Sequence, residues 1–173
     1  MINYKEKLGK IKAFVFDFDG VLSDGKVWVY DNKEVVRCTN VKDGYALQYA
    51  VKKGYTIALI SGATSSSIDN RMKALGVKQI YTGCANKMTT YDKFLADNEL
   101  KPDEVLIMGD DIPDYEILKK CGVATCPADA AIEIKEIVDY ISIFKGGEGC
   151  VRDVIEQTLR LHGMWFHPDA VNW

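Results

Sequence analysis

The chain has 173 residues, of which 47% are hydrophobic and 27% are charged, and its formal net charge is −3. This length suits one domain with a sizeable core, so we expect residues 1–173 to fold as a single domain. Neither a basic cluster nor an apolar run of about 18 residues is present, so we predict no nucleic-acid or membrane partner. Five scattered cysteines without a CxxC pair, and an N-terminus without a signal-like apolar segment, favour the reducing cytoplasm.

Short apolar runs alternate with helix-like segments along the chain. The runs predict buried strands at residues 11–16, 55–60, 79–82, 104–108 and 123–126, with residues 140–143 extended. Helices are expected at 41–54, with Asp43 as N-cap, from 61–67 to about 75, at 87–98, up to 120, at 128–137 and at 150–162. Residues 146–149 are expected to form a flexible loop and the tail, 163–173, to be irregular. This order predicts an α/β, Rossmann-like fold: a doubly wound, mainly parallel sheet with helices on both faces.

A β-hairpin is predicted as a small insertion after the first strand, over residues 26–38. Two short strand-like runs, 27–30 and 35–38, flank the polar residues 31–34. Apolar side chains such as Trp28 and Val29 occupy both faces of the hairpin. Because an isolated hairpin is only marginally stable in water, these faces need cover. Trp28 could cover an edge of its own domain, but we favour a contact with another subunit.

The first strand ends in two acids, Asp17 and Asp19, followed by Gly20. Side chains two residues apart lie on the same side of a strand, so we expect these carboxylates to face each other and to need a cation between them. Ligand sets made only of oxygen suit Mg²⁺. The alternative is a solvated turn, because aspartate and glycine are common in turns.

Polar groups also follow two further strands of the predicted sheet. In open α/β sheets, ligands bind beyond the carboxyl ends of the strands, so we expect these groups to meet at one edge. Acids could hold Mg²⁺, and a hydroxyl at a helix N-terminus with a nearby lysine could hold a phosphate. Together they indicate phosphoryl transfer, although each alone could be a turn, a surface lysine or a helix cap. The groups are Asp17 and Asp19, Ser61 and Gly62, Lys87, and Asp110, Asp111 and Asp114.

In this order and spacing, the four groups resemble the four motifs of the haloacid dehalogenase superfamily of phosphatases. The resemblance implies that Asp17 is a nucleophile that forms an aspartyl-phosphate, and that Asp19 is first the general acid and then the base. It also implies that Mg²⁺ is held by Asp17, the Asp19 carbonyl, Asp110 and Asp111. The phosphoryl group would be bound by Ser61, Gly62 and Lys87, and Asp114 would orient Lys87 or a metal-bound water.

Many members of this superfamily carry a cap domain over the site, but this chain leaves no room for one. Residues 62–86, between Ser61 and Lys87, hold only one expected helix and one short strand. An uncapped site either accepts a macromolecular substrate, such as a phosphoprotein, or is closed by a neighbouring subunit.

The hairpin and the segments 41–45 and 146–153 resemble more closely the 3-deoxy-D-manno-octulosonate 8-phosphate phosphatases. Nonulosonate 9-phosphate phosphatases and the non-catalytic C-terminal domains of some acylneuraminate cytidylyltransferases are similar. The resemblance implies a Mg²⁺-dependent sugar-phosphate phosphatase of lipopolysaccharide biosynthesis and a homotetramer with hairpins at its centre. It also implies that the glycine-rich segment 146–152 and the C-terminal tail close a neighbour's site.

One residue departs from this pattern, because Ala63 stands where the octulosonate phosphatases typically have arginine and the nonulosonate group glutamate. Arg71, or Arg152 from a neighbour, could bind the substrate instead, so the sugar is open between the two groups. A non-catalytic oligomerisation module would usually have lost one of the acids, and all are present here. A regulatory phospho-acceptor domain would lack Asp19, the second acid that drives hydrolysis.

Overall fold

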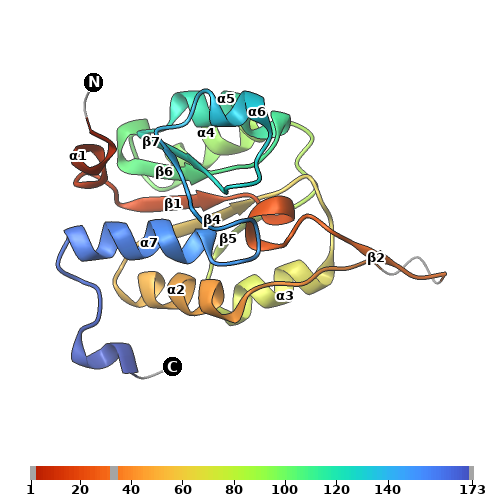
Figure 1. Cartoon of the computed structure of the whole chain (residues 1–173), viewed down its shortest axis with the longest axis horizontal. Helices are drawn as coiled ribbons and strands as arrows, with labels where there is room; N and C mark the ends of the chain where they lie inside the picture. Colours follow the sequence, from red (N-terminus) through yellow and green to blue (C-terminus); the bar gives the residue numbers. More distant parts are fainter. Residues whose placement is uncertain (1–2, 32–34, 172–173) are drawn as a thin grey trace.

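The computed structural model describes residues 3–31 and 35–171, which form two layers of helices around one sheet (Figure 1). The described residues contain a six-stranded sheet in the order β5-β4-β1-β6-β7-β8, and every neighbouring pair is parallel. The predicted doubly wound α/β fold is therefore confirmed. The strands are β1 (Ala13–Phe16), β4 (Thr56–Ile60), β5 (Gln79–Tyr81), β6 (Val105–Met108), β7 (Val123–Cys126) and β8 (Tyr140–Ile141).

Strand β1 lies at the middle of the sheet, and its four residues are all buried. Phe14 and Phe16 point to one face of the sheet, and Ala13 and Val15 point to the other, as the alternation of a strand requires. The first face is covered by α1 (Tyr4–Leu8), α2 (Val41–Lys52), α3 (Ser66–Ala74) and α7 (Cys150–Leu161), and the second by α4 (Lys87–Asp97), α5 (Tyr115–Lys120) and α6 (Ile132–Lys135).

The predicted elements differ from the structure in several places. Helix α1 was not predicted, and α6 spans four residues rather than 128–137, because residues 127–131 turn and run beside Asp110, whose carbonyl accepts from the Ala131 N–H. The tail is not wholly irregular, since Pro168–Val171 form a short 3-10 turn. The N-cap of α2 is Asn40, whose side chain accepts from the Lys42 N–H, and not Asp43.

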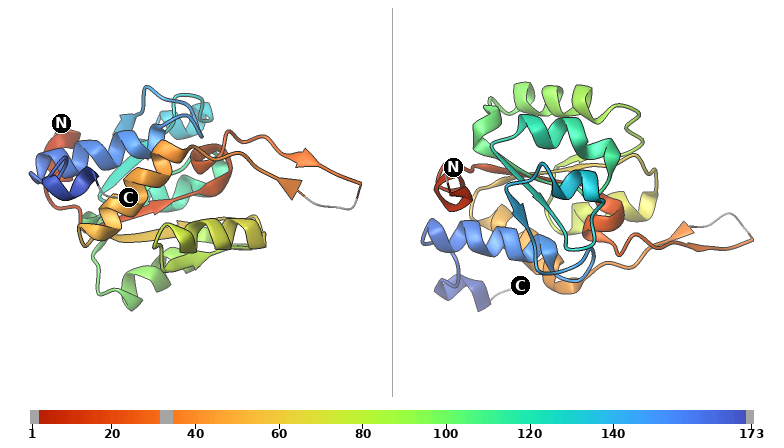
Figure 2. Two further views of the ribbon diagram at one scale, coloured as in Figure 1. Left: turned by 90° about the horizontal axis from the view of Figure 1, so that it is seen from below. Right: turned by 45° about the horizontal axis from the view of Figure 1, so that its top comes forward.

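The insertion after β1 is a two-stranded antiparallel hairpin, β2 (Trp28–Val29) and β3 (Val35–Val36), which extends away from the body of the molecule (Figure 2). Trp28 is 69% exposed and Val29 is 72% exposed, so nothing in the described chain covers them. Between Ser61 and Lys87 the described chain holds α3 and β5 and no cap domain, as predicted. The described helices include none long and apolar enough to span a membrane.

The glycine-rich segment that precedes α7 packs against the loop that follows β1. The Gly147 N–H donates to the Val21 carbonyl at 2.9 Å. A Cβ atom added to Gly146 would lie 2.0 Å from the Gly20 carbonyl oxygen, so only glycine permits this approach. Buried Asp43 accepts from the backbone N–H groups of Arg152 at 2.7 Å and Gly149 at 3.2 Å, and therefore holds the start of α7. The segment thus supports the strand end that carries the two N-terminal acids.

Candidate active site

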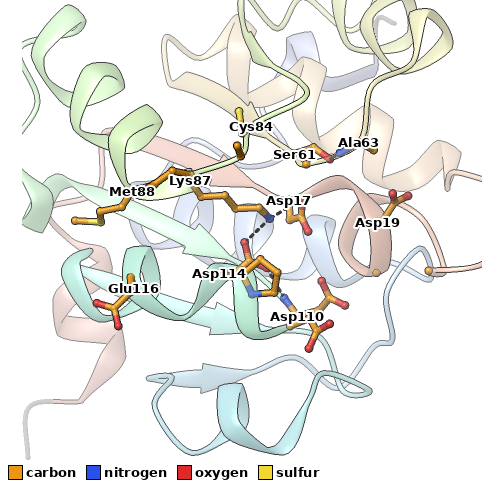
Figure 3. A pocket seen from close by; sticks show the side chains of 17 residues that line it. Asp17, Asp19, Ser61, Ala63, Cys84, Lys87, Met88, Asp110, Asp114 and Glu116 are labelled. Carbon is orange, nitrogen blue, oxygen red and sulfur yellow. Dashed lines mark hydrogen bonds and ion pairs between the residues drawn. The ribbon is translucent and has the colours of Figure 1, made fainter.

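The ends of β1, β4 and β6 meet at one edge of the sheet around a cavity of about 700 Å³ (Figure 3). The ladder between β1 and β6 continues one residue past the strand, because the Asp17 N–H donates to the Met108 carbonyl at 3.1 Å. Lys87 enters as the first residue of α4, whose cap is the Asn86 side chain. The predicted residues that line the cavity are Asp17, Asp19, Ser61, Gly62, Ala63, Lys87, Asp110, Asp111 and Asp114.

Lys87 lies between two buried carboxylates on the floor of the cavity. Its Nζ atom donates to Asp114 Oδ1 at 2.7 Å and lies 3.0 Å from Asp17 Oδ1. The contact with Asp17 is an ion pair without the alignment of a hydrogen bond, so Asp17 Oδ1 has no hydrogen-bond partner in the described structure. Asp114 also accepts from the Asp110 N–H at 3.2 Å through its other oxygen. These contacts leave Asp17 close to a cation and free to contact a ligand.

The carboxylates of Asp17, Asp110 and Asp114 form a cluster that fits a divalent cation. One oxygen from each lies within 4.8 Å of the others. Asp110 Oδ1, like Asp17 Oδ1, is buried without a hydrogen-bond partner in the described part of the chain. Buried polar atoms in native proteins are nearly always paired, and carboxylate oxygens are the ligands of hard cations. The Asp110 carboxylate packs directly against Gly20. A Cβ atom added to Gly20 would lie 2.0 Å from Asp110 Oδ2, so a larger residue would clash with it there.

The electrostatics of the cluster show an excess of negative charge. Burial, followed by the charge of Asp114, raises the pKa of Asp17 to about 7, although Lys87 opposes the shift. Burial and the charges of Asp17 and Asp114 raise the pKa of Asp110 to about 7 as well. Burial would lower the pKa of Lys87, but Asp114 and Asp17 outweigh it and raise that pKa. One lysine therefore does not balance these acids, and a bound cation would favour their ionised forms.

Ser61 follows β4 on the opposite side of the cavity from Asp114 (Figure 3). It is buried, and its Oγ atom accepts from the Ala63 N–H at 3.2 Å. Because a hydroxyl can accept and donate at once, the Ser61 hydroxyl can still donate to an anion. Helix α3 begins only at Ser66, so residues 61–65 form a loop rather than a helix N-terminus at this point.

The Asp19 carboxylate does not join that of Asp17, which corrects the expectation that these two side chains face each other. The chain leaves the strand at Phe16 and turns at Gly20, whose φ of 83° lies in the left-handed region. The Asp19 carboxylate is consequently outside the three-carboxylate cluster and binds Arg37, which follows β3 in the hairpin. Sequence reasoning missed Arg37, because no local pattern relates a residue of the hairpin's return path to Asp19.

Three predicted site residues lie apart from this cluster. The Asp111 carboxylate is exposed and accepts from the Ile112 N–H. The Arg71 guanidinium packs against Gly44 in α2, where a Cβ atom would lie 2.6 Å from Nη2. Arg152 pairs with Glu156 at 3.2 Å and stacks over the Trp165 ring. Neither arginine lines the cavity of its own chain. Cavity residues that the sequence did not single out include Cys84, Asn86, Met88 and Glu116.

A doubly wound sheet with this constellation at its strand ends defines a class, the haloacid dehalogenase-like hydrolases, and the model of that family matches residues 79–152. The chain is 32% identical over 157 residues to the 3-deoxy-D-manno-octulosonate 8-phosphate phosphatase KdsC of Escherichia coli, and the match covers 91% of this chain and 84% of that protein.

Two solved structures of 3-deoxy-D-manno-octulosonate 8-phosphate phosphatases are similar throughout. The Yersinia pestis structure has a TM-score of 0.92 and 28% identity, and covers 94% of this chain and 88% of its own. The Moraxella catarrhalis structure, a complex with magnesium ion, phosphate ion and KDO, has a TM-score of 0.91 and 29% identity, and the match covers 95% of each chain. The chain therefore belongs to the 3-deoxy-D-manno-octulosonate 8-phosphate phosphatase family, a family of phosphoric monoester hydrolases.

Proposed function

We propose that this protein hydrolyses a 3-deoxy-ulosonate sugar phosphate, 3-deoxy-D-manno-octulosonate 8-phosphate in the first instance, in a Mg²⁺-dependent reaction. The product would be the free sugar acid, which is consumed in the cytoplasm for lipopolysaccharide biosynthesis. The observation that carries the proposal is the Asp17 carboxylate. Its Oδ1 atom is ion-paired with Lys87 at 3.0 Å and accepts no hydrogen bond in the described structure, and the carboxylate clusters with those of Asp110 and Asp114. Family membership supports the same reaction.

The residues around the cavity suit a two-step transfer. In the first step Asp17 attacks phosphorus, the bond from phosphorus to the sugar oxygen breaks, and Asp19 gives its proton to that oxygen. In the second step water attacks the phosphorus of the aspartyl-phosphate and passes a proton to Asp19, and the Asp17 carboxylate is released. Ser61 and Lys87 hold the phosphoryl oxygens, and Asp114 keeps Lys87 in place through their hydrogen bond.

The proposed Mg²⁺ ligands are the carboxylates of Asp17 and Asp110 and the backbone carbonyl of Asp19, with Asp111 acting directly or through water. Mg²⁺ bound there would offset the charge of the acids and of the phosphoryl oxygens. Asp114 lies in the same cluster, but each of its oxygens already accepts a hydrogen bond, one from Lys87 and the other from the Asp110 N–H. We therefore assign it to positioning rather than to the metal.

A second copy of the chain would complete this site. Among the described residues that line the cavity, Lys87 is the one basic side chain, so the lining offers a substrate carboxylate no second cation. We propose that Arg71 or Arg152 of a neighbouring subunit supplies it, with the segment 146–152 and the tail contributing to closure. The exposed apolar hairpin supports assembly, and the family resemblance points to a homotetramer with the hairpins at its centre.

The alternative substrate is a nonulosonate 9-phosphate. Ala63 favours neither sugar, because a methyl group binds neither a carboxylate nor a hydroxyl. Its position beside Ser61 on the cavity wall leaves space there for either ligand. The two substrates therefore have to be compared directly.

The test is phosphate release from octulosonate 8-phosphate, two nonulosonate 9-phosphates, arabinose 5-phosphate and a phosphotyrosine peptide, each with Mg²⁺ and with EDTA. Turnover of octulosonate 8-phosphate that requires Mg²⁺ is expected. Asp17→Asn should lower kcat by at least about 1,000-fold, because the amide is not a nucleophile. Full turnover by Asp17→Asn would refute the nucleophile. Preference for a nonulosonate 9-phosphate would keep the mechanism and change the substrate, and no turnover of any compound would refute the proposed function.

A further inference from the structure

The contact between Arg37 and Asp19 has a geometry that a chance surface ion pair rarely has. Arg37 Nε donates to Asp19 Oδ1 at 2.6 Å, and Arg37 Nη2 donates to Asp19 Oδ2 at 3.1 Å. The Arg37 side chain is only 13% exposed, so the guanidinium is largely withdrawn from water. Two parallel bonds between a planar guanidinium and a carboxylate restrict both position and rotation. This pair therefore determines which way the Asp19 carboxylate faces.

Few other contacts fix the orientation of the Asp19 carboxylate. Among the described residues, the hydrogen bonds to the Asp19 carboxylate come from Arg37 and from Ser23 Oγ, and the Ser23 contact is long at 3.3 Å. Asp19 also lies beyond the end of β1, directly before the turn at Gly20, so the backbone ladder does not constrain its side chain. Without Arg37, one weak contact would remain, and the carboxylate could take up several rotamers.

We propose that Arg37 is a positioning residue that orients Asp19 for proton transfer and thereby couples the hairpin to the chemistry. The inference rests on the proposed function, because it assumes that Asp19 acts on the leaving oxygen and then on water. Small displacements of a reacting group lower rates strongly, since the productive geometry is then only one of several. Arg37 lies on the segment that we expect at the subunit contact, so assembly and the orientation of Asp19 share one structural element.

The test is steady-state kinetics of Arg37→Gln, with p-nitrophenyl phosphate and the preferred sugar phosphate. Loss of orientation should lower kcat by about 10- to 100-fold and change KM by less than about two-fold. Arg37→Lys keeps the charge without the planar fork and should recover part of the loss. The matched control is Lys26→Gln, which removes a charge from the other arm of the hairpin, where the side chain is exposed and does not contact Asp19. Its kcat should equal that of the wild type.

A double-mutant cycle separates positioning from a structural role. In an Asp19→Ala background, Arg37→Gln should change kcat for p-nitrophenyl phosphate by less than about two-fold, because its target is already absent. A sizing column and circular dichroism should show the fold and assembly of the wild type for each variant. An equal loss of kcat in both backgrounds, or an unchanged kcat in Arg37→Gln, would overturn the inference.

A raised KM with an unchanged kcat would also overturn it, because Arg37 would then bind substrate directly. A wild type that releases no phosphate from any compound in Mg²⁺ would refute the proposed function, and the role of Arg37 with it. An active wild type with unaffected Arg37 variants would refute the role of Arg37 alone.

Discussion

Replacing Asp110 by asparagine should stabilise the metal-free protein and remove its response to Mg²⁺. Asp110 faces two other carboxylates, and its buried Oδ1 atom has no hydrogen-bond partner in the described chain. Because its pKa is about 7 instead of the ordinary value near 4, ionising it at pH 7.5 costs the folded state about 4 kcal/mol. Water at the open side of the cavity screens roughly half of this cost, so we expect Asp110→Asn to raise the free energy of unfolding by about 2 kcal/mol.

The gain should depend on pH in a defined direction. Because burial and repulsion raise the pKa values of Asp17 and Asp110, the folded protein binds more protons than the unfolded chain between about pH 4 and pH 7. These two groups therefore make the free energy of unfolding of the metal-free wild type fall as the pH rises through this range. Asp110→Asn removes one of these groups, so its advantage should be absent near pH 4 and complete above about pH 7.

Thermal unfolding in EDTA and in Mg²⁺, at pH 4.5 and pH 7.5, measures both effects. About 2 kcal/mol corresponds to a Tm higher by roughly 4–8 °C in a chain of this length. Mg²⁺ should raise the Tm of the wild type at pH 7.5 and leave that of Asp110→Asn nearly unchanged. Asp103→Asn, which removes an exposed acid paired with Lys10, is the matched control and should behave like the wild type. A lower Tm for Asp110→Asn in EDTA at pH 7.5 would refute the reasoning.

Three further substitutions test the supports of the site. Asp43→Ala leaves the Gly149 and Arg152 N–H groups without their acceptor, so urea unfolding should show a loss of about 1–3 kcal/mol, and an unchanged midpoint would contradict this. Gly146→Ala places a Cβ atom against the Gly20 carbonyl and should reduce the free energy of unfolding by at least about 2 kcal/mol in the same assay, and an unchanged midpoint would contradict this. Trp28→Asp should shift the proposed tetramer to smaller species on a sizing column, and an unchanged elution volume would remove the hairpin from the proposed interface.

Local sequence patterns were sufficient for the strands and for the residues at their ends. An unbroken apolar run such as 13–16 is typical of a strand that is buried on both faces. The acids that come directly after such a run lie at the end of the strand, because charged groups are costly to bury in the core. Asp17, Ser61, Lys87 and Asp110 were therefore predicted to meet at one edge, and they line one cavity. The N-cap of α2 was predicted wrongly, because Asn40 and Asp43 are both good capping residues and the burial of Asp43 depends on α7, far along the chain.

The sequence by itself determined the α/β architecture, the types of chemical group at the site and the family, because strand and helix periodicity and motif order are properties of neighbouring residues. Only the tertiary structure decided which charges meet. The Asp19 carboxylate pairs with Arg37 of the hairpin rather than facing that of Asp17, and Asp114, not Asp111, joins the carboxylate cluster. Which groups become partners depends on how segments that are distant in the sequence pack together and on which charged groups are buried away from water. The spacing of residues along the chain determines neither the packing nor the burial.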